Sequence, residues 1–288
     1  MSSLVGQPGP QLPVRLTVRS PRSGSARRRG LISALIELLS FGNVLQELVK
    51  RDLKVRYKRS VLGIFWTMLN PLLMMVITTI VFSALFRSTI TNFPIYVLSG
   101  YIVWGFFSQA TVAASTSVLD SAGLTRKIYV PAALFPLASV CSAMINLVLS
   151  LVPLLVIVLG TGGTITWAWL ILPISFLMIA TFTYGLGLIL AASAVFFRDT
   201  VYTFQVLLVA WMYLTPLFYP REIVPAQWAG LIGLNPVYHL IQLVRGPVYE
   251  GVLPGADDLL LSLGFAVCVA LVGSWYFERS QVRFAVYL

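Results

Sequence analysis

The sequence has few charged residues. Asp, Glu, Lys and Arg make up 10% of its 288 positions, whereas soluble domains contain about 25%. Hydrophobic residues account for 58% of the chain, and the mean hydropathy is +0.88. This balance excludes an ordinary soluble domain and predicts an integral membrane protein.

Residue types that build reactive sites are equally scarce. The chain has two cysteines, Cys141 and Cys268, and one histidine, His239. Both cysteines fall in apolar runs, so we expect neither a disulfide framework nor a metal site. We find no catalytic constellation, because Asp257 and Asp258 stand alone and are expected in a solvated outer loop.

Two further absences bear on the energy source. No G-x-x-x-x-G-K-[ST] phosphate loop occurs in the sequence, which excludes ATP hydrolysis by that motif. No charged residue is expected inside a span, which argues against an ion-coupled transporter. Energy for any transport would therefore come from outside this chain.

Long uncharged runs define the fold class. A bilayer core of about 30 Å requires roughly 20 apolar residues in a helix. The 70-residue run from 128 to 197 must contain two spans, and Gly160-Thr-Gly-Gly163 is its natural break. We predict an all-α membrane protein with six spans in a domain of residues 36–288, at about 61–86, 95–119, 132–159, 167–195, 201–219 and 258–277.

The run at 223–244 is interrupted by helix breakers. Pro225, Gly230, Gly233 and the Asn235-Pro236 pair cut it into short pieces. A seventh span would fit the charge distribution almost as well, but the breakers favour two short re-entrant helices on the outer side. They predict an outer gate containing Asn235, Pro236 and His239, with an inert packing hairpin as the alternative.

Positive charge sets the orientation. Under the six-span scheme, 17 of the 20 Lys and Arg residues lie on one side, and only Arg87, Arg221 and Arg245 lie on the other. The positive-inside rule then places both termini in the cytoplasm. Residues 1–35, which are rich in Arg, Ser, Pro and Gly, are predicted to be a disordered cytoplasmic tail.

Two cytoplasmic elements carry mixed charge and apolar residues. Residues 41–59 show helical spacing of apolar positions and predict an amphipathic helix before the first span. It is either an anchor on anionic headgroups or a surface for a protein partner. Residues 120–131, between the second and third spans, are either a connector or a small helix that fits a cleft on a partner.

Four segments in the same order resemble one known family. They are Leu48-Val-Lys-Arg-Asp-Leu-Lys-Val-Arg-Tyr-Lys-Arg-Ser-Val-Leu-Gly-Ile-Phe-Trp-Thr-Met-Leu-Asn-Pro-Leu72, Leu98-Ser-Gly-Tyr-Ile-Val-Trp-Gly-Phe-Phe107, Arg126-Lys-Ile-Tyr-Val-Pro131 and Leu234-Asn-Pro-Val-Tyr-His-Leu240. The chain from about residue 40 onward resembles the permeases of type-2 ATP-binding-cassette exporters, in the subgroup that exports polysaccharides such as O antigen, teichoic acid and capsule.

The resemblance implies a half-transporter in the bacterial cytoplasmic membrane. Two copies would pair as a homodimer, and two separate nucleotide-binding subunits would carry ATP and Mg²⁺, so this chain would be no enzyme and hold no cofactor. It also implies that the two cytoplasmic elements contact the ATPase subunit. The residues carried over are Arg51, Asp52, Arg56, Tyr57, Lys58, Arg126, Lys127, Ile128 and Tyr129.

The family's channel is lined with aromatic rings that stack on sugars. The resemblance makes Phe65, Trp66, Trp104, Phe106, Phe107, Trp211 and Tyr213 channel candidates, although aromatic residues also pack helices and form interfacial belts.

The implied substrate is a lipid-linked polysaccharide. Arg outnumbers Lys 16 to 4, which points toward a high-GC bacterium. In such bacteria the resembled exporters include one for a lipid-linked galactan, so the resemblance makes a galactan the leading expected substrate. A type-2 exporter of drugs or small lipids is the alternative within transport, and a membrane-embedded transferase is the alternative outside it. Membrane lipids are expected partners and nucleic acid is not.

Overall fold

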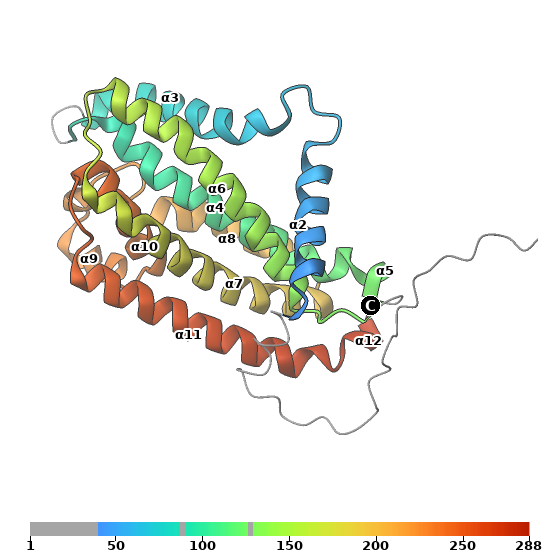
Figure 1. The fold of residues 1–288 in the computed structure, drawn as a ribbon. Coiled ribbons are helices and arrows are strands. Elements are labelled where there is room, and N and C mark those ends of the chain that lie inside the picture. The colour runs from blue at the N-terminus through green and yellow to red at the C-terminus, as the bar shows by residue number, and fades with distance from the viewer. Residues whose placement is uncertain (1–39, 87–89, 126–128, 288) are drawn as a thin grey trace, which may run out of the picture.

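The chain forms a bundle of long helices (Figure 1). The structure is a computed structural model that describes residues 40–86, 90–125 and 129–287. No strand occurs among these residues. The helices are α2 (Gly42–Tyr57), η1 (Gly63–Phe65), α3 (Trp66–Phe86), α4 (Phe93–Asp120), α5 (Ala122–Thr125), α6 (Leu134–Gly160), η2 (Trp167–Ile171), α7 (Leu172–Phe196), α8 (Asp199–Leu214), η3 (Arg221–Ile223), α9 (Ala226–Gly233), α10 (Pro236–Arg245), π-helical η4 (Gly246–Glu250), α11 (Ala256–Gln281) and α12 (Phe284–Tyr287).

The all-α membrane class is confirmed. In the described part of the chain, five helices are long and apolar enough to cross a membrane. They are Gly63–Phe82, Phe93–Leu124, Leu134–Gly160, Trp167–Phe196 and Ala256–Gln281. Each coincides with one of the six predicted spans. The predicted tail, residues 1–35, lies outside the described residues.

The remaining predicted span, 201–219, is shorter than expected. Helix α8 has 16 residues and ends at Leu214. Thr215 has an extended backbone with ψ of 131°, as the residue before a proline prefers, because the Pro216 ring disfavours the helical region there. The chain therefore continues from Thr215 to Phe218 as a buried non-helical segment.

The interrupted run forms two short helices, as the breakers predict. Helix α9 has 8 residues and α10 has 10, and neither is long enough to cross a bilayer. Asn235 separates them, and its side-chain oxygen accepts a hydrogen bond from Val237 N. Pro236 follows as the first residue of α10, where its missing N–H costs nothing.

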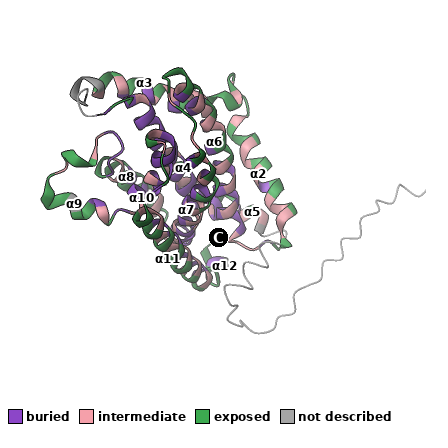
Figure 2. Cartoon of the chain, turned by 60° about the vertical axis from the view of Figure 1, so that its left-hand side comes forward, coloured by how far each residue is buried: buried purple, intermediate pink, exposed green. Residues whose placement is uncertain are grey.

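The two ends of the bundle differ. Helix α2 crosses one end, near α5 and α12, whereas α9 lies at the opposite end (Figure 1). We call these the α2 end and the α9 end. Helix α4 runs through the middle of the bundle and is the most enclosed of the long helices, as the buried residues in Figure 2 show. The main core cluster joins α4 to α6, α7 and α10.

Helices α7 and α11 approach each other closely through two glycines. A Cβ added at Gly185 would lie 2.6 Å from the backbone of Ala270, and one added at Gly273 would collide with the carbonyl of Gly185. Small residues permit such contact, which membrane helices use because lipid provides little hydrophobic force for association. This contact fixes α11 against the rest of the bundle.

Gly273→Ala tests the close approach. The new methyl group should push α11 away from α7 and lower the free energy of unfolding by about 1–3 kcal/mol, measured as denaturation of the purified protein in detergent. Gly264→Ala on the same helix is the matched control, because no atom lies within 4 Å of a Cβ there. It should leave stability unchanged or raise it by up to ~1 kcal/mol. Equal stability of both variants would contradict the close approach.

Candidate functional site

Helix α2 is held against the bundle by its apolar stripe. Leu48 is 4% exposed and belongs to a cluster with Val130, Leu134 and Phe135, where Leu45 and Val49 of the same stripe also pack. The stripe therefore faces protein. The sequence left two alternatives for α2, a membrane anchor and a surface for a protein partner. Because the apolar stripe is buried against the bundle, it is the polar face of α2 that remains available to a partner.

That polar face carries the residues expected to contact an ATPase subunit. The side chains of Arg51, Arg56 and Lys58 are exposed, and Asp52 is half-buried. Arg51 donates two hydrogen bonds to Asp52 Oδ1, at 3.2 and 3.0 Å. The group is thus a mixed-charge surface rather than a run of free cations.

The second expected contact element lies beside the first. Tyr129 is 59% exposed, and its ring centroid is 6.5 Å from that of Phe41. Arg126, Lys127 and Ile128 lie outside the described residues. The structure therefore brings the start of α2 and the segment leading into α6 together at the α2 end of the bundle.

Tyr57 connects α2 to the interior of the bundle. Its hydroxyl donates a hydrogen bond of 2.9 Å to Asn146 Oδ1 on α6. Burial raises the pKa of the Tyr57 phenol, so the hydroxyl keeps its proton near neutral pH. Tyr57 therefore links the polar surface of α2 to α6 and is only partly exposed as a contact residue.

A cavity opens next to this link. Its volume is about 460 Å³, and side chains from α2, α3, α4 and α6 line it. Tyr57 and Asn146 lie on one wall, and Asn70 and Gln109 are two of its other polar groups.

The aromatic candidates fall into two groups. Phe65, Trp66 and Tyr213 are 66%, 47% and 60% exposed, so a path outside the protomer can still include them. Phe106 and Trp66 also line the cavity.

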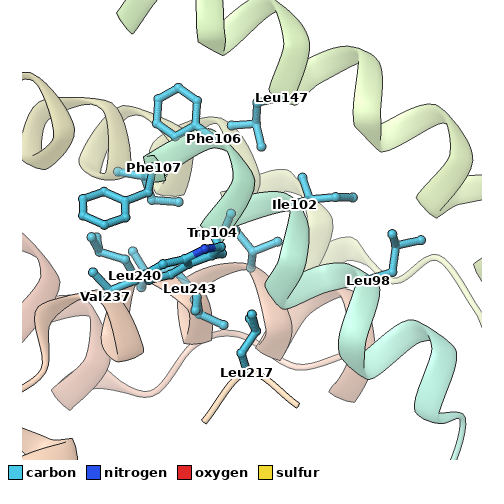
Figure 3. Packing of buried hydrophobic residues seen from close by; sticks show 14 of the residues in the cluster. Leu98, Ile102, Trp104, Phe106, Phe107, Leu147, Leu217, Val237, Leu240 and Leu243 are labelled. Atoms are coloured by element: carbon cyan, nitrogen blue, oxygen red, sulfur yellow. The ribbon is translucent and has the colours of Figure 1, made fainter. Parts of the chain in front are cut away.

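The other aromatic candidates pack inside the protomer. Trp104 and Phe107 are 5% and 1% exposed, and Phe107 makes edge-to-face contacts with Trp104 and Trp211 at 5.6 and 5.4 Å. Figure 3 shows Trp104 among core residues of α10, whereas Phe106 lies toward Leu147 of α6. Helical geometry turns successive residues about 100° apart, so neighbours on α4 face different surroundings.

Asn235 joins the three helices around the predicted outer gate. Its side chain accepts a hydrogen bond from Trp211 Nε1 at 2.9 Å and donates one to Thr215 Oγ1 at 2.8 Å. The break between α9 and α10 is therefore tied to the end of α8. Asn235 is 9% exposed, so its side chain is used in these hydrogen bonds between helices and is turned away from the surface.

His239 is paired with Asp258, which corrects the expectation that Asp258 lies in a solvated loop. His239 Nδ1 is 2.6 Å from Asp258 Oδ1, and Nε2 is 2.9 Å from the carbonyl oxygen of Gly233. The hydrogen bond with Asp258 raises the pKa of His239, since it favours the charged imidazolium. The pair links α10 to the first turn of α11.

Arg245 was expected outside the spans in a loop, and the structure buries it. It is 2% exposed, and its guanidinium donates to the carbonyl oxygens of Pro216 and Leu217 at 3.0 and 3.1 Å. It also donates to Tyr96 Oη at 3.1 Å and lies 3.8 Å from the centre of that ring. A Cβ at Gly100 would lie 2.6 Å from Arg245 Nη2, so the glycine makes room for it.

Two of these buried polar residues, Arg245 and Asn146, stand out in the sequence, although the overall composition does not reveal them. Arg245 ends a run of apolar positions that recur on one face of α10, and Asn146 is a solitary amide in the long uncharged run. Such polar residues in apolar helices commonly serve as joints between helices.

These features define a multi-pass membrane permease with a helix across one end and a broken helix pair at the other. The chain belongs to the ABC-2 type transporter family, which matches residues 43–249. An O-antigen export system permease protein RfbA from Myxococcus xanthus is 34% identical over 257 residues, covering 88% of this chain and 99% of that protein.

More distant relatives carry related names. An O-antigen export system permease protein RfbA from Klebsiella pneumoniae is 28% identical over 84% of this chain and 94% of its own length. The polysialic acid transport protein KpsM from Escherichia coli is 23% identical over 79% of this chain and 88% of its own length.

Asp258→Asn tests the ion pair at the α9 end. A histidine with a raised pKa contributes stability that is fully present below its unfolded pKa of about 6.5 and is lost as pH rises through the folded pKa. At pH 5.5 the variant should therefore lose roughly 1–2 kcal/mol of unfolding free energy, and the loss should shrink toward alkaline pH. Denaturation curves across pH measure this.

Asp257→Asn is the matched control, since that neighbouring carboxylate is exposed. A pH-independent difference between wild type and Asp258→Asn would contradict the charged pair.

Proposed function

We propose that the chain is the transmembrane subunit of an ATP-driven exporter that moves a lipid-linked polysaccharide across the bacterial cytoplasmic membrane. The relatives named for O-antigen and polysialic acid support the substrate class. The observation that carries the proposal is the joint surface of α2 and Tyr129 at one end of a bundle that contains five candidate spans. ATP hydrolysis takes place on a separate subunit bound there.

The α2 surface can transmit force into the bundle. A subunit that pushes on Arg51 or Tyr129 moves α2, whose stripe is fixed to α6 through Leu48 and whose end is hydrogen-bonded to Asn146. Displacement of α2 therefore displaces α6. Both termini and the α2 end lie in the cytoplasm, as the distribution of Lys and Arg supports.

The proposed path runs between two copies of the chain. Helices α3 and α8 expose polar side chains in their second turns, Asn70 on α3 and Thr203 and Gln205 on α8. An amide that faces lipid lacks hydrogen-bond partners, which is costly. The exposed middle of α11, by contrast, is apolar, with Leu263, Val267 and Leu271 among its residues.

This difference assigns the surfaces of the protomer. We assign the α3 and α8 faces to a homodimer contact around a polar path and the α11 face to lipid. Phe65, Trp66 and Tyr213 then border the path. Among polysaccharides we propose a galactan, because the excess of Arg over Lys points toward a high-GC bacterium and the resembled exporters of such bacteria include one for lipid-linked galactan.

Depletion of the protein in its own bacterium tests the substrate class. Lipid-linked glycan should accumulate several-fold in the cytoplasmic leaflet while surface polysaccharide falls, because synthesis continues and export stops. Extraction and mass spectrometry of lipid-linked glycans provide the measurement, and re-expression of the wild-type chain is the control. Normal glycan export together with altered drug tolerance would favour an exporter of drugs or small lipids instead.

A double substitution on the joint surface of α2 and Tyr129 tests the ATPase contact. Arg51→Glu combined with Tyr129→Asp should reduce co-purification of the ATPase subunit about tenfold or more, since loss of an interfacial aromatic anchor typically costs ~2 kcal/mol. The native mass of the wild-type complex should correspond to two permeases with two ATPase subunits.

The matched control lies at the other end of the bundle. Arg221→Glu combined with Trp228→Asp changes the same residue classes at exposed positions of η3 and α9 and should leave assembly intact. If the α2 variant assembles and hydrolyses ATP as the wild type does, the contact lies elsewhere.

A further inference from the structure

The cavity beside α2 extends from the end of that helix to the middle of α4. Its volume of about 460 Å³ falls within the range of small-molecule sites, roughly 300–1,000 Å³. Gln109 lies on its wall and is exposed. It sits about 24 Å along α4 from Phe93 and about 16 Å from Asp120, so it is well inside the span.

Three amide side chains belong to the polar part of the lining. Asn70, Gln109 and Asn146 come from three different helices, α3, α4 and α6. Asn146 is 7% exposed, and its Nδ2 has no hydrogen-bond partner within the described part of the chain. Each unsatisfied buried donor costs about 1–3 kcal/mol. A small turn of the Asn146 side chain would bring this donor to a ligand that accepts a hydrogen bond in the cavity.

The remaining lining narrows the chemistry of that ligand. Trp66, Tyr101 and Phe106 contribute aromatic rings, and Arg56 is the one charged residue among the described residues that line the cavity. An amide both donates and accepts hydrogen bonds, as a sugar hydroxyl does, whereas a carboxylate accepts only and an ammonium donates only. A guanidinium matches the oxygen geometry of phosphate.

We propose that each protomer holds the sugar–phosphate junction of its lipid-linked substrate in this cavity. The first sugar binds to the amides of Asn70, Gln109 and Asn146, and the phosphate faces Arg56 at the end of α2. This rests on the proposed function and adds a binding site within each protomer. Asn146 also accepts the hydrogen bond from Tyr57. Binding of the ligand to Asn146 therefore affects the hydrogen bond that joins α2 to α6.

Gly105 gives access to the cavity for an experiment. It lies on the cavity wall, and a Cβ there would meet only Gln109 Nε2, at 4.0 Å. Larger side chains at this position therefore extend into the cavity without displacing the backbone.

The first measurement is protection of a cysteine from modification. Gly105→Cys, combined with Cys141→Ser and Cys268→Ser, is labelled with a maleimide in the purified permease–ATPase complex. The probe is a synthetic polyprenyl diphosphate that carries one N-acetylhexosamine. Labelling should slow by a factor of one plus the ratio of probe concentration to Kd, or about tenfold at ten times Kd.

Two further probes separate the sources of phosphate. Polyprenyl diphosphate without sugar should protect less than the glycosylated probe, and phosphatidylglycerol should not protect. Equal protection by phosphatidylglycerol would overturn the proposal in favour of a phospholipid headgroup site. Absence of protection by every probe would overturn it as well.

The second measurement is export by cells that carry Gly105→Leu. The leucine should fill the cavity and reduce export at least tenfold while the ATPase subunit still co-purifies. Gly264→Leu, on the open surface of α11, is the control and should export normally. Normal export by Gly105→Leu overturns the cavity proposal alone, whereas a wild-type chain that exports no polysaccharide overturns the proposed function.

Discussion

The buried guanidinium of Arg245 sustains the non-helical part of the bundle. Where α8 ends, the backbone from Thr215 onward leaves the helix at a depth where lipid offers no hydrogen bonds. Arg245 donates to the carbonyl oxygens of Pro216 and Leu217, and Tyr96 donates to that of Tyr219. Without these donors the carbonyl groups of Pro216, Leu217 and Tyr219 would lose their side-chain partners, and the turn from α8 into the short helices α9 and α10 would be costly. The predicted gate region therefore rests on a non-helical segment whose carbonyl groups are paired by Arg245 of α10 and Tyr96 of α4.

Periodicity and helix breakers predicted most of the fold. Uncharged runs marked the five long helices, and Pro225 and Asn235-Pro236 marked the short ones, because a helix needs its apolar length and cannot continue through these residues. The end of α8 was missed because the apolar run continues past Pro216 to Pro220. Composition registers hydrophobicity, and the backbone restriction before proline is a local effect that overrides it.

The candidate site was less predictable, since its key contacts join distant parts of the chain. Tyr57 and Asn146 are 89 positions apart, and Tyr96 and Arg245 are 149 apart. No spacing rule reports such pairs. Residues on the polar face of α2 were predictable because amphipathic spacing separates them from the stripe. Trp104 and Phe107 were not distinguishable from exposed aromatics, because ring chemistry suits both a core and a channel.

The glycine contact between α7 and α11 also distinguishes a rigid part of the bundle from a part that can move. Backbones in direct contact have no side chains between them that could change rotamer, so these two helices can only move together or separate at high cost. Helix α3 is different: it contains no glycine, so it packs on the bundle through side chains. We infer that α7 and α11 form the rigid part of the bundle and that α2 and α3, together with α6 to which α2 is tied, form the part that ATP-driven work would reorient.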